Sequence, residues 1–453
     1  MKRRNFIGSA LIGSAGISLA ASNVPFASSV LGANDKIVLA IIGSGSRGLG
    51  TIINTCKINA NVVIKTVCDV NDWKAEKAMA AIEKELGYKT QRSRNMKEVF
   101  DDKDVDAVWI STPEHWHSLA TVWACQAGKD VYVEKNPSIN IWEGRKMVEA
   151  AEKYKRIVQI GFQNRSAPYA FSAREYIKSG KLGQVVAVKS YNMLGGGKWT
   201  AKPDTAVPSG LNWDAWLGPA PLVPYNPGMH DMESRGGWNN YWAYSGGILA
   251  DDASHVLDLA RFVLGDPGHP KSVYGWGGNF AFGSKRETPE FQTITYDFGK
   301  FTLTCDSGTS TNYMKKAPQS IRMSLTEFPD WRTYACRTEI YGTEGLMYLG
   351  RHGGGWQVKR EDSKIIAQDK GIFPDADHQK NFIESLRTRK EPNGTAEQGQ
   401  LSATLIHLGN ICYRVGNKQL FFDGKTERFV GNEEANKLLK TSYRDNYRMP
   451  EKV

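Results

Sequence analysis

Three ionisable side chains recur along one short stretch of the sequence, Gly246 to Phe262. Asp251, His255 and Asp258 are spaced i, i+4 and i+7, which places them on one face of a helix that begins after the glycines. A histidine one turn from a carboxylate could accept and hold a proton near neutral pH. A capped surface helix with a local Asp–His pair is the plain alternative. A different face carries the apolar residues that a core would take, namely Val256, Leu259, Ala260 and Val263.

The composition is that of an ordinary soluble globular protein. Its 453 residues leave room for two or three domains, and 41% of them are hydrophobic and 23% charged. The net charge is +10, but the lysines and arginines are scattered and form no basic block. We therefore expect general surface charge and no nucleic-acid partner.

The first thirty residues have the three parts of a signal peptide. Arg3 and Arg4 precede a mild apolar run, Phe6 to Ala21, and small residues follow around Ala27 to Ser29. The paired arginines indicate the twin-arginine route and a periplasmic protein. A general secretion signal or an uncleaved anchor is the alternative. No later stretch is long and apolar enough to span a bilayer, so we expect no stable membrane insertion.

The cysteines show no pairing pattern. They have neither CxxC spacing nor the arrangement of a disulfide framework, and several lie in apolar runs. Buried free thiols would suit a protein that folds in a reducing cytosol before export. The six are Cys56, Cys68, Cys125, Cys305, Cys336 and Cys412.

A glycine-rich turn follows the first strand-like run, Lys36 to Ile42. It reads G-x-G-x-x-G, a helical stretch follows it, and the next strand ends at Asp69. Glycines let the backbone approach a pyrophosphate at a helix N-terminus, and Asp69 could bind the ribose hydroxyls. An acid there favours NAD, although Arg47 leaves NADP open. The predicted cofactor-binding residues of this part are Gly43, Gly45, Ser46, Arg47, Gly48 and Asp69.

Strands and helices continue to alternate as far as Phe162, which is typical of a doubly wound parallel sheet. Ligands of such sheets bind beyond the carboxyl ends of the strands. Two segments lie at those ends, and from them we expect Thr112, Pro113, His117, Glu134 and Lys135 to line the nucleotide pocket. We predict a Rossmann domain over residues 35–160.

Lys135 stands at one of these strand ends and could stabilise an alkoxide as a hydride leaves it. An ion pair with Glu134 would be the plain alternative. His115 and His117 form an H-x-H pair, but no cysteine or third ligand stands at supporting spacing. We therefore expect no metal.

These segments together resemble the Gfo/Idh/MocA oxidoreductases, named for glucose–fructose oxidoreductase, inositol dehydrogenase and a rhizopine catabolism protein. The resemblance rests on the glycine loop, Thr112 to His117, Gly128 to Lys135, Gly246 to Asp258, and Gly342 to Asn410 in the family's order. It is greatest for exported members with a twin-arginine signal. The resemblance implies that Lys135 contacts the reacting hydroxyl and that His255, paired with Asp251, is the general base. One departure is that Asn136 replaces the proline of the family's Glu-Lys-Pro motif.

A second domain is predicted over residues 161–430, with a polar tail over 431–453. Alternating segments, among them Ser320 to Leu325, indicate a mostly antiparallel sheet, so the whole chain is α/β followed by α+β. In the family such an open sheet has the substrate site on one side and oligomer contacts on the other, which implies a homo-oligomer. A tryptophan-rich insertion, residues 192–245, could stack sugars or pin itself in place. The predicted substrate residues are Gln163, Arg165, Trp199, Asp251 and His255.

Together these features predict NAD-dependent oxidation of a sugar hydroxyl, with a tightly bound cofactor because free NAD is scarce outside the cytosol. Two alternatives remain open. One is a redox-neutral glycosidase that oxidises, eliminates, hydrates and reduces again. The other is a sugar-binding protein without catalysis on the same scaffold.

Overall fold

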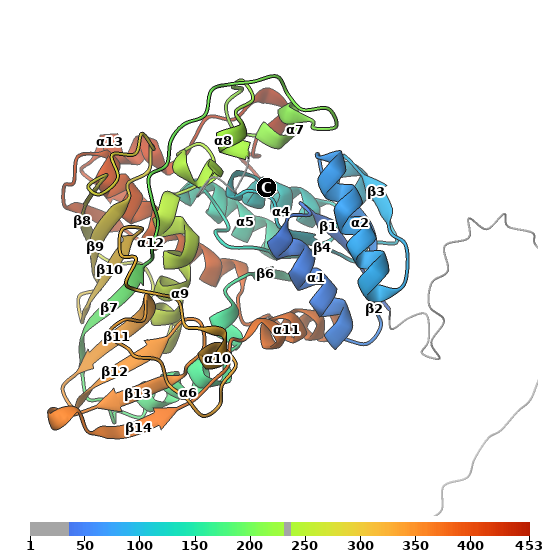
Figure 1. The fold of residues 1–453 in the computed structure, drawn as a ribbon. Coiled ribbons are helices and arrows are strands. Elements are labelled where there is room, and N and C mark those ends of the chain that lie inside the picture. Colours follow the sequence, from blue (N-terminus) through green and yellow to red (C-terminus); the bar gives the residue numbers. More distant parts are fainter. Residues whose placement is uncertain (1–35, 231–236) are drawn as a thin grey trace, which may run out of the picture.

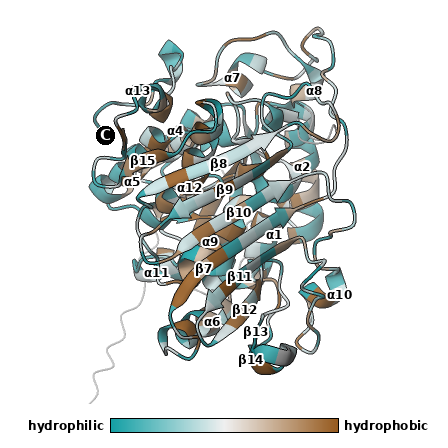
Figure 2. Ribbon diagram, turned by 90° about the vertical axis from the view of Figure 1, so that its left-hand side faces the viewer, coloured by the Kyte–Doolittle hydropathy of each residue, from teal (hydrophilic) through white to brown (hydrophobic). Residues whose placement is uncertain are grey.

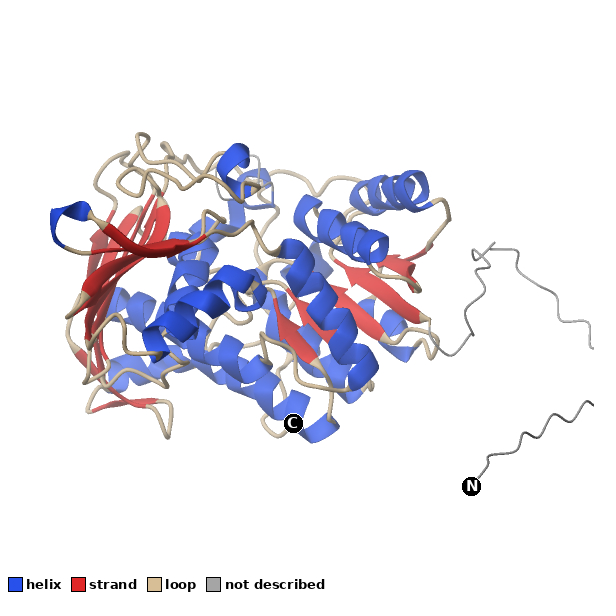
Figure 3. Cartoon of the chain, turned by 90° about the horizontal axis from the view of Figure 1, so that it is seen from below, coloured by secondary structure: helices blue, strands red, loops and turns tan. Residues whose placement is uncertain are grey.

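A computed structural model describes residues 36–230 and 237–453, and the predicted signal peptide lies outside these ranges. The described residues form two α/β units, each built on one sheet. Figure 1 shows the chain running from the first unit, at the right, to the second, at the left. In Figure 3 the two sheets stand on opposite sides of the molecule, with helices between them.

The first unit is a Rossmann fold. Its strands are all parallel and lie in the order β3-β2-β1-β4-β5-β6. Strands β1 and β4 are wholly or largely buried apolar runs, as expected for a parallel sheet covered on both faces. The strands are β1 (Ile37–Ile42), β2 (Val62–Cys68), β3 (Gln91–Ser93), β4 (Ala107–Ile110), β5 (Asp130–Val133) and β6 (Val158–Ile160). The helices are α1 (Ser46–Ile58), α2 (Asp72–Leu86), α3 (Met96–Asp101), α4 (His117–Gln126) and α5 (Ile141–Tyr154).

The second unit is a ten-stranded sheet in which only β7 and β10 pair in parallel among the described strands. Its order is β14-β13-β12-β11-β7-β10-β9-β8-β15-β16. Burial alternates along β9, so one face is packed and the other is open, and Figure 2 looks onto this sheet. Its strands are β7 (Val185–Met193), β8 (Ser272–Gly278), β9 (Phe291–Asp297), β10 (Thr302–Gly308), β11 (Cys336–Gly342), β12 (Gly345–Gly350), β13 (Trp356–Lys359), β14 (Ile365–Asp369), β15 (Leu420–Asp423) and β16 (Arg428–Val430).

Three helices cover the packed face and supply most of the second core: α6 (Pro168–Lys178), α9 (Ser254–Val263) and α12 (Ala396–Arg414). Helix α12 also packs on α5 and so joins the two units. Helix α11 (Asp375–Thr388) returns to the first unit, where Phe382 packs against Trp109 and Tyr132. The predicted α/β fold with a largely antiparallel second sheet is confirmed.

One predicted strand is wrong. Residues Ser320 to Leu325 lie outside the sheet, and a short helix, α10 (Gln319–Arg322), occupies part of them. Pro318 precedes this helix with a φ of −62°, a value that suits the start of a helix. A proline also has no backbone N–H to donate to a neighbouring strand. Alternation over six residues was therefore a weaker signal than the proline before it.

The insertion also differs from a bare loop. Its described part contains α7 (Trp213–Leu217) and α8 (Pro227–His230), and Trp213 stacks on Trp216 at 4.5 Å between ring centroids. The C-terminal tail, which includes α13 (Glu433–Asn436), packs against it, because Arg444 Nε donates to Gly218 O at 2.7 Å. No helix in the described ranges has both the length and the apolar character to cross a membrane.

Candidate active site

A large cavity, about 1330 Å³, opens between the two units. Its lining comes from the carboxyl ends of β1, β2, β4 and β5 on one side and from the second unit and the insertion on the other. Every predicted catalytic and cofactor-binding residue lines it. They are Gly43, Gly45, Ser46, Arg47, Gly48, Asp69, Thr112, Pro113, His117, Glu134, Lys135, Asp251 and His255.

The glycine loop forms the nucleotide end of this cavity. Gly43 has a φ of +83°, and a Cβ on Gly48 would lie 1.8 Å from Ser111 Oγ, so both positions need glycine. Nothing lies within 4 Å of a Cβ placed on Gly45, where the backbone faces open space at the start of α1. This open cradle at a helix N-terminus fits a pyrophosphate.

Asp69 is held in place at the end of β2. Ser44 donates from both its backbone N and its Oγ to Asp69 Oδ2, each at 2.8 Å. The carboxylate is partly exposed within the cavity, where ribose hydroxyls can donate to it. Arg47 is the residue that kept NADP possible as the cofactor, but in the structure its guanidinium is already bound to two carboxyl groups. It bonds Glu134 Oε1 at 3.2 Å and both Asp375 oxygens at 3.0 Å.

His117 connects the segments that follow β4 and β5. Its Nδ1 lies 2.7 Å from Asn136 O and its Nε2 lies 2.8 Å from Thr112 O. Burial lowers the pKa of His117 to about 4, so the ring is neutral and its one N–H donates to one of the two carbonyls. The residue therefore positions the loops after β4 and β5, which carry Thr112 and Lys135.

The reacting groups gather at the other end. Lys135 Nζ lies 2.6 Å from Asp251 Oδ1. Burial lowers the pKa of Lys135, but Asp251, Asp252 and Glu114 outweigh it, so that pKa lies above its usual value and the ammonium stays charged. The plain alternative for Lys135, an ion pair with Glu134, is absent among the described residues, where Glu134 pairs with Arg47 instead.

The expected Asp251–His255 pair does not form. Residues Leu249–Ala253 make a π-helical turn, with a ψ of −105° at Asp251, and the regular helix begins only at Ser254. The wider turn removes the i, i+4 alignment and directs Asp251 to Lys135. Within the described ranges His255 Nδ1 has no hydrogen-bond partner.

His255 is suited to act as a base even without this pair. It is buried at the start of α9, edge-on to Phe162 at 5.8 Å between ring centroids. Burial, then the nearby charges of Arg351 and Lys135, hold the pKa of His255 well below its usual value. The imidazole is therefore neutral at physiological pH and free to accept a proton.

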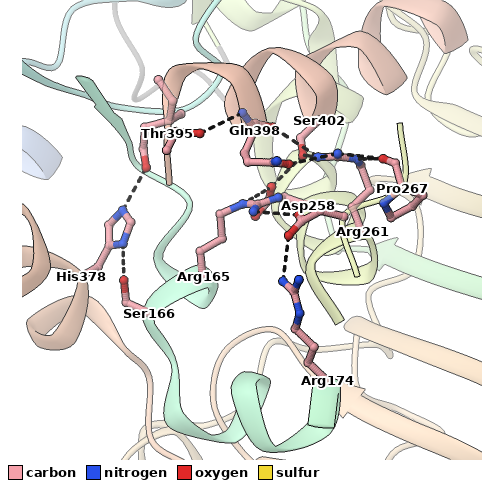
Figure 4. A network of polar contacts seen from close by, with 12 residues as sticks. Arg165, Ser166, Arg174, Asp258, Arg261, Pro267, His378, Thr395, Gln398 and Ser402 are labelled. Carbon is pink, nitrogen blue, oxygen red and sulfur yellow. Dashed lines mark hydrogen bonds and ion pairs between the residues drawn. The ribbon is translucent and has the colours of Figure 1, made fainter. Parts of the chain in front are cut away.

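Asp258 and Arg165 belong to a structural network outside the cavity (Figure 4). Arg165 Nε donates to Asp258 Oδ1 at 2.7 Å, and Ser402 Oγ donates to the same oxygen at 2.7 Å. Arg261 donates to Ser402 Oγ at 2.8 Å, so the network joins α9 to α12. Both members of the Arg165–Asp258 pair are 1% exposed. Arg165, which the sequence predicts to be a substrate residue, therefore lies in the core and not in the cavity lining.

The other two predicted substrate residues also lie away from the cavity lining. Gln163 is buried, and its Nε2 donates to Tyr132 OH at 3.4 Å. Trp199 is buried against Tyr241. From the insertion, Trp216 and Trp238 line the cavity in its place. The insertion is therefore held in place by contacts among its own aromatic side chains, and it also contributes to the cavity lining.

Sequence reasoning missed several charged residues here. Glu114 is buried beside Lys135, and burial raises the pKa of Glu114 to about 7. The others come from segments distant in sequence, namely Asp252, Lys316, Arg322, Arg351 and His352. The sequence does contain one signal of a functional turn here, an arginine and a histidine followed by three glycines at 351–355.

One group of possible metal ligands lies at this end. Ligand atoms of Asp252, Cys336 and His352 fall within 4.8 Å of one another. Asp252, however, forms an ion pair with Lys316, and the buried Cys336 thiol has a raised pKa. Because Arg351 adds a further positive charge, this environment opposes a divalent cation.

Comparison with known proteins places this geometry in a family. Residues 37–162 match the family model described as an oxidoreductase family, NAD-binding Rossmann fold, and residues 174–274 and 346–449 match the model of its C-terminal alpha/beta domain. The chain is 25% identical to scyllo-inositol 2-dehydrogenase (NAD(+)) of Bacillus subtilis over 334 residues, which cover 72% of this chain and 80% of that protein. It is 27% identical to levoglucosan dehydrogenase of Pseudarthrobacter phenanthrenivorans over 205 residues, but these cover only 45% of this chain and 43% of that protein.

Solved structures share the fold. Aldose-aldose oxidoreductase from Caulobacter crescentus, complexed with glycerol, superposes with a TM-score of 0.61 at 18% identity, over 85% of this chain and 100% of the other. Levoglucosan dehydrogenase in complex with NADH and levoglucosan gives 0.60 at 16% identity, over 85% and 99%. The glycine cradle, Asp69 and the matched domains together make NAD the cofactor that this fold holds. The chain belongs to the Gfo/Idh/MocA family of NAD-binding oxidoreductases.

Proposed function

We propose that this protein oxidises a hydroxyl group of a sugar or sugar derivative and keeps NAD bound through its catalytic cycle. The observation that carries the proposal is the neutral imidazole of His255, which lines the same cavity as the Lys135 ammonium and the glycine cradle. The names of the relatives, which include inositol, levoglucosan and aldose enzymes, support a polyhydroxylated substrate.

The neutral and the charged residues of the site have different roles in the proposed reaction. His255 accepts the hydroxyl proton, because its ring is neutral, lines the cavity and is therefore in the form that can take up a proton. Lys135, charged and held by Asp251, stabilises the negative charge that develops on the substrate oxygen. NAD, when bound, accepts the hydride that the carbinol carbon loses, and a carbonyl results. Trp216 and Trp238 line the cavity and offer flat aromatic faces on which a sugar ring can stack.

The test uses protein purified without residues 1–30 and with no added nucleotide. It is incubated with free sugars and glycosides while products and the near-ultraviolet absorbance of NADH are followed. We expect NADH to appear once, and a second carbonyl compound to discharge it. Cleavage of glycosides over many turnovers with no lasting NADH would instead identify the redox-neutral glycosidase. Absence of both reactions, with no nucleotide released on denaturation, would contradict the proposal.

We also propose export to the periplasm by the twin-arginine route, supported by Arg3, Arg4 and the apolar run after them. N-terminal sequencing of the periplasmic protein should show that the first thirty or so residues are removed. Arg3→Lys with Arg4→Lys should leave the precursor in the cytosol. Normal periplasmic accumulation of this variant would contradict the proposed route.

We further propose that the open face of the second sheet joins copies of the chain in a homo-oligomer. Tyr274 and Trp276 on β8 point to this face with 48% and 58% of their surfaces exposed, and Phe421 on the adjacent β15 is 56% exposed. Exposed aromatic groups on a sheet face favour protein contact. Light scattering should give a multiple of the chain mass, and Trp276→Asp should lower it. A monomeric wild-type protein would contradict the proposal.

A further inference from the structure

The substrate end of the cavity holds more positive charge than its own residues neutralise. Four cations line it beside three carboxyl groups, those of Asp251, Asp252 and Glu114. Two of the cations are in ion pairs, Lys135 with Asp251 and Lys316 with Asp252. Arg322 and Arg351 have no ion pair within the described residues, and the Nε of each is buried without a hydrogen-bond partner. Unpaired buried charge is costly, so it is retained where a ligand pairs with it.

Arg351 is the more deeply buried of the two. Only 3% of it is exposed, and both its Nε and its Nη1 lack partners in the described part of the chain. A guanidinium presents parallel N–H donors that match the two oxygens of a carboxylate or of a sulfate or phosphate ester. Burial without such a partner lowers the pKa of Arg351.

The backbone holds Arg351 firmly between β12 and β13. Its N donates to Cys336 O at 3.1 Å, and its carbonyl accepts from Asn164 Nδ2 at 3.0 Å. The guanidinium lies 5.0 Å from the centre of the Phe373 ring, which Arg322 also contacts at 4.7 Å. The two guanidinium groups therefore share one aromatic platform and are preorganised before any ligand arrives.

Arg351 also lies close to the reacting groups. Arg351, His255 and Asp252 line the same part of the cavity, and after burial the charge of Arg351 helps to hold the pKa of His255 below its usual value. The phosphates of the nucleotide have their own donors at the start of α1, in the glycine loop. A partner for Arg351 must therefore belong to the molecule whose hydroxyl faces His255.

We propose that the substrate is an acidic sugar, whose carboxylate or oxyanion ester is bound by Arg351 with Arg322 beside it. This inference rests on the proposed sugar oxidation and specifies its substrate class. Asp251 and Asp252 do not oppose it, because each is already neutralised by a lysine. An anion at this position fixes the sugar ring while His255 takes the proton from a neighbouring hydroxyl.

The test compares matched ligands on the nucleotide-loaded enzyme. Methyl glycosides of glucuronate, galacturonate and mannuronate are each titrated beside their neutral methyl esters and parent hexosides, by calorimetry and by oxidation rate. Primary sulfate esters of the same hexosides form a second arm, which separates a carboxylate from an oxyanion ester. We expect one acidic ligand to bind at least about 10-fold more tightly than its neutral partners.

Arg351→Gln should abolish this preference, weakening the acidic ligand by about 30-fold or more and the neutral ones by less than about 3-fold. Arg351→Lys, which keeps the charge but not the paired donors, should fall between the two. Arg332→Gln is the matched control, because Arg332 is 89% exposed and does not line the cavity. Removal of an unpaired buried charge should leave the thermal midpoint of the ligand-free protein unchanged or higher.

Equal affinity for acidic and neutral ligands, or a preference that persists in Arg351→Gln, would overturn the inference and leave the proposed sugar oxidation standing if neutral sugars react. If no sugar of either kind is bound or oxidised, the proposed function fails and this inference fails with it.

Discussion

At the nucleotide end of the cleft, Gly43 to Gly48 and Asp69 come from two neighbouring strands and bind through backbone groups and one oriented carboxylate. At the substrate end, Glu114, Lys135, Asp251, Lys316 and Arg351 come from five distant segments and act through charge. The first end is a local turn that the family shares. The second is assembled by the second unit, so it is where this chain can differ from its relatives.

The largest expected effect is on the chemical step at the substrate end. His255→Ala should lower kcat by about 10²–10⁴-fold, because it removes the side chain that we propose takes the proton from the substrate hydroxyl. Steady-state kinetics with the amount of bound nucleotide measured in parallel will check it. His269→Asn, remote from the cavity, is the control. Unchanged turnover in His255→Ala would rule out the assigned base.

A smaller effect is expected at the nucleotide end. Asp69→Ala should raise the Kd for NAD by about 10–100-fold and that for NADP much less, since only NAD offers a free 2′-hydroxyl to the carboxylate. Titration of stripped enzyme with both nucleotides measures this. Asp104→Asn, a change on the exposed surface, should leave both affinities as they are. Equal losses for NAD and NADP would show that Asp69 does not read the ribose.

The pH dependence of kcat/KM should show which charged neighbours lower the pKa of His255. Burial and the charges of Arg351, Lys135, His352 and Arg47 keep the pKa of His255 well below 6.5. The neutral ring is the active form, so kcat/KM for a neutral sugar should fall only at pH well below 6.5.

Arg351→Gln removes one of these cations, which raises the pKa of His255 and moves the acid limb upward by about one pH unit. Glu114, whose pKa is about 7, titrates in a neighbouring range, so Glu114→Gln measured alongside separates the two groups. An acid limb that stays in place in Arg351→Gln would contradict the proximity of Arg351 to His255.

The smallest effect on the reaction is expected outside the cleft. Arg165→Met leaves Asp258 buried without its cation, which should cost about 3–5 kcal/mol of unfolding free energy. The KM of the folded enzyme should change little, because Arg165 does not line the cavity. Chemical denaturation and kinetics below the unfolding transition measure the two quantities. A large rise in KM at unchanged stability would return Arg165 to the substrate.

What the sequence alone determined is the part of the protein that is local. Alternating strands and helices, the glycine turn and an acid about twenty residues later specify a Rossmann domain and its cofactor, because each signal lies within one βαβ unit. The same holds for Lys135 at a strand end. The family resemblance extended this interpretation over the second sheet, which the fold confirms.

Only the tertiary structure decided the roles of the three residues that share one stretch. A π-helical turn sends Asp251 to Lys135, while Asp258, one turn beyond His255, meets Arg165 in the core. A helical spacing pattern could not show this, because it assumes a regular α-helix throughout. Nor could it place Arg351, about a hundred residues later, in the same cavity as His255. Long-range electrostatic partners are set by how two sheets pack, and that information is spread over the whole chain.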